Sequence, residues 1–391
     1  MENNISIIGT DCCGCANCSN VCPQRAILMT ANYEGFLYPE ISDKCIDCGV
    51  CLKVCPQMMN YANERGAEGY AAISKDTDIL QNASSGGVWG TIAKHFLSTN
   101  NSYICAASFV DGEVKHIITK DISEIRKCQG SKYVQSNLNG CFKIIKDYLK
   151  DDKRILFCGT PCQVAALYSF LKKRPLNLFT IDLICHGVPS PTFLKKDLEY
   201  YCKDVSRLKN VRFRWKNPRT PKFKSGFFLY IEKNNKSELY SSGFDPYFST
   251  FMNGESFRLS CYQCKYANLH RVGDITIGDF DSWTLYPNFH PNDGKSTVII
   301  NTPLGGSLWN YVDGFFDYIC IDINKEAEKN HQLQCPFDKS SIRDRIYKDV
   351  NSWTIKELRK NYAHPSTKRQ RVLFMIQEYL PCIYKSLIKN L

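Results

Sequence analysis

Near its start the chain reads Cys12-Cys13-Gly14-Cys15-Ala16-Asn17-Cys18-Ser19-Asn20-Val21-Cys22-Pro23, and later Cys45-Ile46-Asp47-Cys48-Gly49-Val50-Cys51-Leu52-Lys53-Val54-Cys55-Pro56. Both stretches have the spacing C-x2-C-x2-C-x3-C-P. In this spacing three thiolates bind one 4Fe-4S cluster, and the fourth, beside the proline, binds the neighbouring cluster. The two stretches therefore predict a bacterial-type dicluster ferredoxin domain over residues 1–60. Zinc sites are a weaker alternative, because they have no use for the third cysteine and the Cys-Pro ending.

The crossover of the fourth cysteine assigns the ligands to two groups. The first cysteine group is Cys12, Cys15, Cys18 and Cys55, and the second cysteine group is Cys22, Cys45, Cys48 and Cys51. Cys13 lies outside the spacing and is interpreted as a bystander rather than a ligand. Two clusters on one small domain form a path for electrons, and such a path has to end on an acceptor.

Cysteine is the anomaly of the composition, with 21 cysteines in 391 residues. The cysteine count is odd, and the N-terminal residues lack the basic start and apolar stretch of a secretory signal. Cluster ligation in a reducing cytoplasm therefore fits better than a disulfide framework. No apolar run reaches the roughly 18 residues that a membrane-spanning helix needs. We therefore expect a cytoplasmic protein that has no membrane span.

The formal net charge is +11, and two clusters of about −2 each lower it to about +7. The basic residues are spread along the chain. This distribution favours a solvated surface or an acidic protein partner over nucleic acid. We expect a ferredoxin or another redox protein as the partner.

Beyond a polar linker at residues 60–69, short apolar strands alternate with amphipathic helices. Strands at 154–158 and 179–185 around a helix at 163–171 predict a βαβ unit, and hence a parallel pair of strands. Alternating apolar residues on both sides of 233–236 indicate a hairpin, so we expect a mixed sheet. The segment 372–391 is interpreted as an amphipathic helix docked on the protein.

Two parts of the larger domain are typical of ligand sites. Ser84-Ser85-Gly86-Gly87 precedes a helix, whose first amides can hold a phosphate or a flavin pyrophosphate; a simple N-cap turn is the plainer alternative. Gly159 and Thr160 end one strand of the βαβ unit, and Cys185-His186-Gly187 ends the other. Ligands of open α/β sheets bind at these carboxyl ends.

Further cysteines are candidates for a third 4Fe-4S cluster. We name them the third cysteine group: Cys162, Cys185, Cys261 and Cys264. The last two form a C-x2-C pair. Taken one at a time, each of the four is also explained as a small buried apolar residue.

The chain resembles the coenzyme F420 hydrogenase/dehydrogenase beta-subunit family, in a bacterial form with an N-terminal two-cluster ferredoxin domain. The resemblance covers roughly residues 1–330 and rests on segments that occur in order: Ser84-Ser85-Gly86-Gly87, Gly130-Ser131-Lys132-Tyr133-Val134-Gln135-Ser136, Gly159-Thr160-Pro161-Cys162-Gln163, Cys185-His186-Gly187, Cys261-x2-Cys264 and Gly278-Asp279-Phe280. It implies a flavin, normally FAD, beside a 4Fe-4S cluster.

By the same resemblance, the residues of these motifs that would contact the cofactor are Ser84, Ser85, Gly86, Gly87, Lys132, Tyr133, Gly159 and Thr160. His186 is the candidate proton donor beside the flavin, because imidazole titrates near neutrality; a structural histidine is the alternative. The family commonly has Gly-Asp-Phe-Trp-Gly where this chain reads Gly278-Asp279-Phe280-Asp281-Ser282-Trp283. We therefore carry over neither the family's substrate nor the deazaflavin in its name.

The sequence predicts an iron-sulfur flavoprotein oxidoreductase, which passes electrons between ferredoxin-type clusters and a flavin, and then to an unidentified organic acceptor. A non-catalytic electron-transfer subunit of a larger redox complex is the alternative. The expected fold class is α+β. It comprises the ferredoxin domain at 1–60, a mixed-sheet α/β module of the flavin type in two parts at 70–149 and 150–325, and a helical C-terminal tail at 326–391.

Overall fold

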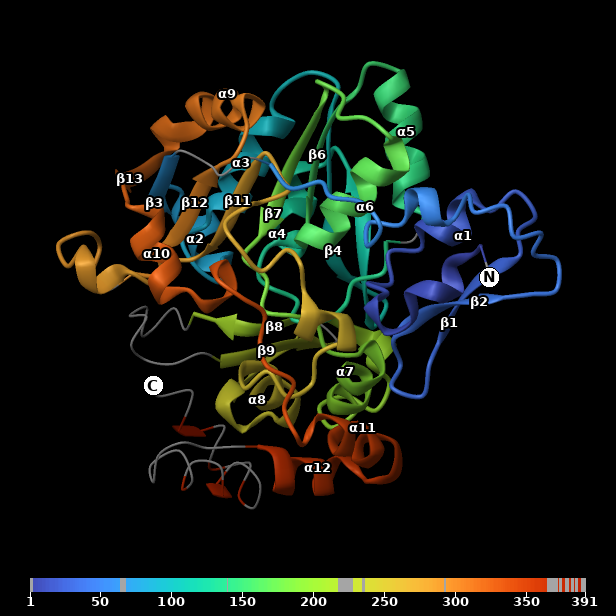
Figure 1. Cartoon of the computed structure of the whole chain (residues 1–391). Coiled ribbons are helices and arrows are strands. Elements are labelled where there is room, and N and C mark those ends of the chain that lie inside the picture. Colours follow the sequence, from blue (N-terminus) through green and yellow to red (C-terminus); the bar gives the residue numbers. More distant parts are fainter. Residues whose placement is uncertain are drawn as a thin grey trace.

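The computed structural model describes residues 3–63, 68–138, 140–216, 228–233, 236–291 and 293–363, and isolated positions between 372 and 387. A small N-terminal domain, blue in Figure 1, lies beside a larger body that contains two sheets. None of the helices in the described ranges has the length and hydropathy needed to cross a bilayer.

The N-terminal domain is built around its cysteines. Its helices and strands are η1 (Ile5–Asp11), α1 (Asn17–Val21), β1 (Ile27–Ala31), β2 (Leu37–Ile41) and η2 (Leu52–Val54). The strands pair antiparallel, and the buried side chains of Ile5, Ile8 and Ile27 pack against cysteines of both motifs. Apolar cover of this kind keeps water from the sulfur atoms.

A sheet of eight strands forms the centre of the body, in the order β13-β3-β12-β11-β7-β6-β4-β5. The strands are β3 (Glu68–Ser74), β4 (Ser102–Val110), β5 (Glu113–Thr119), β6 (Arg154–Gly159), β7 (Leu178–Leu183), β11 (Ile275–Asp279), β12 (Ser296–Ile300) and β13 (Phe316–Cys320). β4, β6, β7 and β11 run parallel, and the other pairs are antiparallel. The predicted parallel pair and the mixed sheet are both confirmed.

Helices cover both faces of this sheet. They are α2 (Thr77–Asn82), α3 (Val88–Leu97), α4 (Ile125–Cys128), α5 (Cys141–Lys150), α6 (Pro161–Leu171), α9 (Pro303–Val312) and α10 (Ile323–Lys329). One core joins α3 and α9 to one face, and a second core joins α5 and α6 to the other face. This part of the α/β module is therefore a three-layer structure, and its central sheet takes strands from both 70–149 and 150–325.

A second sheet lies outside the central one. β8 (Leu208–Trp215), β9 (Phe228–Lys233) and β10 (Lys236–Ser241) form an antiparallel sheet. The sequence predicts that the hairpin β9-β10 belongs to the main sheet, and this prediction is wrong. The hairpin pairs with β8 in the second sheet. The tip of its turn, residues 234 and 235, lies outside the described residues.

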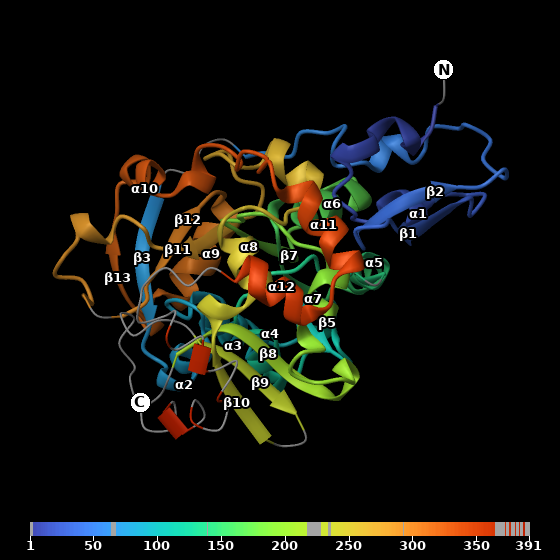
Figure 2. The same cartoon turned by 90° about the horizontal axis from the view of Figure 1, so that it is seen from below.

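Four helices share the core of this second sheet: α7 (Pro191–Leu198), α8 (Pro246–Met252), α11 (Arg343–Ser352) and α12 (Ile355–Tyr362). Figure 2 shows them beside the strands β8 to β10. The described start of the predicted C-terminal tail is thus helical and packed. Most of the helix expected at 372–391 falls outside the described residues.

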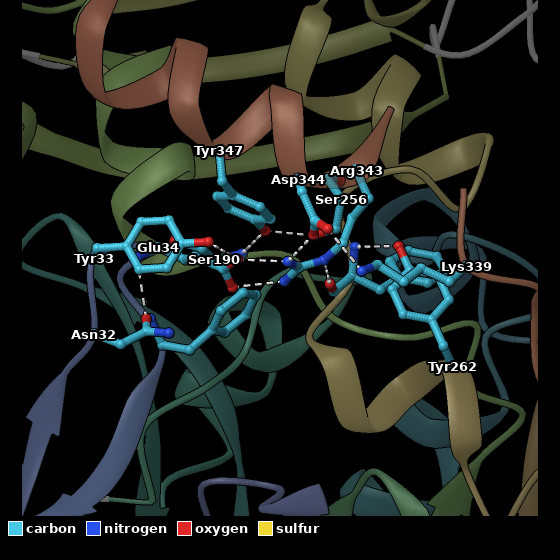
Figure 3. Close-up of polar contacts among 12 residues, drawn as sticks. Asn32, Tyr33, Glu34, Ser190, Ser256, Tyr262, Lys339, Arg343, Asp344 and Tyr347 are labelled. Carbon is cyan, nitrogen blue, oxygen red and sulfur yellow. Dashed lines mark hydrogen bonds and ion pairs between the residues drawn. The ribbon is translucent and has the colours of Figure 1, made fainter. Parts of the chain in front are cut away.

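A buried ion pair fastens the N-terminal domain to helix α11 (Figure 3). Glu34 lies between β1 and β2, and its carboxylate accepts from Arg343 Nη1 and Nη2 at 2.5 and 2.6 Å. Arg343 Nε donates to Phe257 O at 2.9 Å. Both charged side chains are almost fully buried, at 1% and 2% exposure. This contact is one of several that join the N-terminal domain to the body.

Candidate cofactor site and cysteine groups

The four members of the second cysteine group come together within the N-terminal domain. Cys22, Cys45, Cys48 and Cys51 line one small cavity of about 20 Å³. The cysteine beside the first proline thus joins three cysteines of the other motif, as the crossover rule expects. Cys48 is exposed, whereas Cys51 is buried. This group therefore reaches the surface.

The first cysteine group lies further inside. Cys12, Cys18 and Cys55 share the apolar core of the N-terminal domain, while Cys15 packs against the core around α5 and α6. Burial and the neighbouring thiols raise the pKa of Cys18 to about 12. Ionisation of crowded, buried thiols costs free energy. Bound iron would offset that cost, because it replaces the protons and stabilises the thiolates.

The third cysteine group comes together where β6 and β7 end. Cys162 lies at the start of α6, Cys185 follows β7, and Cys261 and Cys264 belong to the segment around η7 (Leu259–Gln263). All four line a cavity of about 60 Å³. Burial raises the pKa of Cys185 to about 12 and of Cys264 to about 11.

Cys13 lines the same cavity, and its interpretation as a bystander rather than a ligand stays a prediction. The neighbouring Cys15 thiol and burial raise the pKa of the Cys13 thiol well above its ordinary value. Among the described residues, no three His, Cys, Asp or Glu side chains converge on a single metal ion. A 4Fe-4S cluster has four irons, each with its own thiolate, so its ligands are spread wider than those of one ion.

A larger cavity of about 270 Å³ lies at the carboxyl ends of β6, β7 and β11. It is lined by most of the predicted cofactor residues: Ser84, Ser85, Gly87, Lys132, Tyr133, Gly159, Thr160 and His186. Gly86 is not among its lining residues, and its amide donates to Ser296 Oγ at 3.0 Å. The larger cavity shares Thr160, Gln163 and the segment 185–188 with the cavity of the third cysteine group, so the two adjoin.

The start of α3 supplies donors to this larger cavity. Gly87 is the N-cap, with a φ of 80°, and no side chain caps the first amides of the helix. Ser84 Oγ accepts from Ser131 N at 2.9 Å, which joins the two family segments. The Trp89 indole Nε1, also at the cavity wall, is buried and has no hydrogen-bond partner in the described structure. A helix N-terminus of this kind favours an anionic group.

Lys132 lines the cavity, but its ammonium is occupied. Nζ donates to the carbonyl oxygens of Cys128, Gln129 and Gly130 at 3.3, 2.8 and 3.0 Å. Burial and the nearby Arg212 lower the pKa of Lys132 to about 7. An ammonium has three N–H donors, so a ligand would have to displace one of these carbonyls.

A charge pair from two different sheets stands at the cavity wall. Arg214 of β8 donates to Asp279 of β11, and also to the Tyr133 hydroxyl at 3.2 Å. Burial alone would lower the pKa of Arg214, but Asp279 and Tyr133 raise it above its ordinary value. Sequence reasoning missed this arginine, because no local pattern ties β8 to the cavity.

Two histidines line the larger cavity, and one of them was missed. His116 Nε2 contacts Cys158 O at 3.0 Å, and its Nδ1 contacts Ser136 Oγ at 3.2 Å. Burial lowers the pKa of His116 to about 4, so it is neutral near pH 7. Burial also lowers the pKa of His186, whose ring lies between Phe251 and Phe337.

Comparisons with known proteins agree with these features. Residues 11–59 match the 4Fe-4S dicluster domain, residues 69–143 match the N-terminal part of the coenzyme F420 hydrogenase/dehydrogenase beta subunit, and residues 152–315 match its C-terminal part. No curated protein matches the chain. A solved structure of the F420-reducing NiFe hydrogenase complex from Methanosarcina barkeri is similar at 18% identity, covering 70% of this chain and 92% of that one, with a TM-score of 0.46.

Proposed function

The chain belongs to the coenzyme F420 hydrogenase/dehydrogenase beta-subunit family and carries an N-terminal 4Fe-4S dicluster domain, and from this we propose that it is an iron-sulfur flavoprotein oxidoreductase. In this proposal electrons pass between ferredoxin-type clusters and a flavin, and then to an organic acceptor. One observation carries it: the cavity lined by the predicted cofactor residues adjoins the cavity of the third cysteine group.

The cysteine groups would hold three clusters. The first and second groups each supply the four thiolates that one cluster takes, and so does the third group. Cys48 brings the second group to the surface, where a redox protein would deliver or collect electrons. The third group then stands between the N-terminal domain and the larger cavity.

The residues of the larger cavity fit a flavin nucleotide in part. A volume of about 270 Å³ lies near the lower end of ligand sites, which begin at about 300 Å³, so the cavity would take part of FAD rather than all of it. Trp89 Nε1 and Asn330 Oδ1 are buried polar atoms at its wall that lack partners in the described structure. A bound cofactor would supply a hydrogen-bond partner to each of these two atoms.

Each element has a distinct role in this proposal. The uncapped start of α3 and Ser84 would bind the pyrophosphate. Arg214, fixed by Asp279, would place a permanent positive charge beside the ring system. FAD itself supplies the exchange between single electrons and hydride. His186 would hold the proton that accompanies reduction of the acceptor.

Anaerobic purification with iron, sulfide and cofactor analysis tests the proposal. We expect about 12 irons per chain, four for each cluster, with one FAD released on denaturation. Mass spectrometry of the released compound separates FAD from the deazaflavin of the family name. A preparation without any flavin or deazaflavin would contradict the proposal, and so would stoichiometric zinc.

Trp89→Phe gives a sharper readout of the cavity. The variant keeps an aromatic ring but removes the Nε1 donor, so we expect weaker retention of FAD with unchanged iron content. Trp283→Phe is the matched control, because Trp283 is 56% exposed and is not among the residues that line the cavity. Equal FAD content in both variants would remove Trp89 from the site.

A non-catalytic role is the second candidate, and the family description favours it by naming a subunit. The isolated protein would then oxidise a reduced dye only when a partner protein is present. Turnover with any small-molecule acceptor in the absence of a partner would reject this candidate in favour of the enzyme.

A further inference from the structure

Cys13 is not part of the spacing of either cluster motif. In the structure it lies where the first cysteine group meets the third. It follows Cys12 and precedes Cys15, which belong to the first group. Its side chain lines the cavity of the third group. In the chain it is two residues from Cys15, and it shares the cavity wall with Cys162. One sulfur atom therefore lies between predicted ligands of two different clusters.

The backbone around Cys13 is fixed by the body of the protein. Arg258 Nε donates to Cys12 O at 2.6 Å, and Arg258 Nη2 donates to Leu37 O at 2.8 Å. Gln135 Nε2 donates to Cys13 O at 3.0 Å. The side chain of Arg258 is 1% exposed, and its guanidinium lies 4.1 Å from the ring centre of Tyr38. The backbone at Cys13 is thus held by side chains from the larger body.

Gly14 allows the close approach that this position needs. Its φ is 68°, and a Cβ atom there would lie 2.3 Å from Gln135 Nε2 and 3.0 Å from Arg258 Nη1. Arg258 O in turn accepts from Cys261 N at 2.9 Å. The same arginine therefore holds the segment of the first group and the segment that carries Cys261.

We propose that Cys13 is the contact through which electrons pass between the first cluster and the third, as a hydrogen-bonding neighbour of their sulfur ligands and not as a ligand itself. This inference rests on the proposed function, since it requires the third cluster. The third group already contains four thiols, which is the full set for one cluster. Cys13 is a fifth thiol at the wall of this cavity, and in this proposal it donates a hydrogen bond to a sulfur atom that binds the cluster.

The order of the path follows from these contacts. The second group reaches the surface, two cysteines of the first group flank Cys13 in the chain, and the third group adjoins the larger cavity. In the step across Cys13 one electron leaves one cluster and enters the other. No bond forms or breaks, and Cys13 keeps its proton.

Hydrogen bonds to cluster sulfur atoms influence the reduction potential. Reduction adds negative charge, which an S–H donor stabilises, so the donor raises the potential of the cluster it contacts. Removing one hydrogen bond to a charged group is expected to shift a one-electron equilibrium about tenfold, which corresponds to about 59 mV.

The test compares Cys13→Ala and Cys13→Ser in the full chain, purified anaerobically with its clusters. We expect both variants to keep the iron and sulfide content of the parent protein. In redox titrations followed by electron paramagnetic resonance, Cys13→Ala should lower the midpoint potential of the first or the third cluster. Freeze-quench experiments should show slower electron transfer between these two clusters, and Cys13→Ser, which retains a donor, should restore both properties in part.

Two results would overturn the inference. Loss of about four irons from Cys13→Ala would make Cys13 a ligand, and unchanged potentials together with an unchanged transfer rate would make it a bystander. Cys320→Ala serves as the matched control, because Cys320 is exposed and lies in β13. If Cys162→Ala also leaves the iron content unchanged, the third cluster is absent, and it is the proposed function that fails.

Discussion

The Lys132 ammonium donates to three backbone carbonyls at the end of α4, although the family resemblance makes this lysine a flavin contact. A cation at the carboxyl end of a helix stabilises the unpaired carbonyls there. In the structure Lys132 therefore binds backbone carbonyls at the wall of the larger cavity, and a direct contact with the cofactor stays a prediction.

Lys132→Met separates these roles. We expect the variant to lose about 1 to 3 kcal/mol of unfolding free energy, because it leaves buried carbonyls without donors, while FAD content stays near that of the parent protein. Denaturant unfolding and flavin analysis check both expectations. Lys127→Met is the control, since Lys127 is 59% exposed on the same helix. Loss of FAD at unchanged stability would instead support a direct contact.

His116 makes stability depend on pH in a defined window. Its folded-state pKa is about 4, below the value of about 6.5 for an unfolded chain. The unfolded state binds the proton first, so this contribution is complete above pH 6.5 and is lost as pH falls towards 4. The full loss is about 3 kcal/mol.

His116→Gln should therefore be destabilised most at neutral pH. The difference in unfolding free energy between parent and variant is expected to shrink by about 2 kcal/mol between pH 7 and pH 5. Anaerobic denaturant titrations at the two pH values measure it. A difference that does not change with pH would show that His116 has the same pKa in the folded and the unfolded protein.

At the scale of elements, the turn between β1 and β2 is anchored on α11 by Glu34 and Arg343. Arg343 also donates to Asp344 at 3.0 Å, but that carboxylate is 55% exposed. Removing the buried partner of a buried cation is costly, because the remaining charge has lost most of its compensation.

Glu34→Gln is expected to destabilise the docked N-terminal domain by about 3 kcal/mol. Hydrogen exchange of the amides in β1 and β2 measures the local opening, and their protection should fall. Glu40→Gln is the matched control, because Glu40 lies exposed on β2. The double variant Glu34→Leu/Arg343→Met should recover much of the loss. Unchanged protection in Glu34→Gln would mean that other contacts hold the domain.

Sequence reasoning succeeded for elements whose signals are local. The unit β6-α6-β7 was identified from two apolar runs around an amphipathic one, and its parallel pairing is confirmed. The short helix α2 and the strand β5 were missed: α2 has six residues, and β5 is half exposed. The hairpin β9-β10 was identified, but pairing with β8 rather than the central sheet depends on distant residues that periodicity does not encode.

The candidate cofactor site shows the same difference between local signals and long-range contacts. The motifs that end strands or start helices were found, because such positions lie at the edge of the sheet where ligands bind. Arg214 and His116 were missed, since they reach the cavity from β8 and β5 through the three-dimensional arrangement alone. Cys13 was set aside because the spacing rule describes cluster ligands and gives no information on a thiol beside them.

At the scale of the whole molecule, the cysteine groups lie in a sequence from the surface to the larger cavity. The second and third groups share no residues and lie in different domains. Their contributions to iron content should therefore be independent.

Cys48→Ala and Cys261→Ala test this independence. Each variant is expected to lose about four irons, and the double variant about eight. FAD content should stay unchanged in Cys48→Ala, whose group is remote from the larger cavity. Iron and flavin analysis of all three variants measures the outcome. A single variant that loses every cluster would show that the groups assemble cooperatively.

The ion pair between Glu34 and Arg343 joins positions that are 309 residues apart. A ribosome adding about 5 to 20 residues per second needs about 15 to 60 s to travel between them. During that interval the nascent N-terminal domain has no helix α11 on which to dock. Iron delivery to its cysteines can therefore precede the docking of this domain on α11, which leaves a period for cluster insertion before the Glu34–Arg343 pair forms.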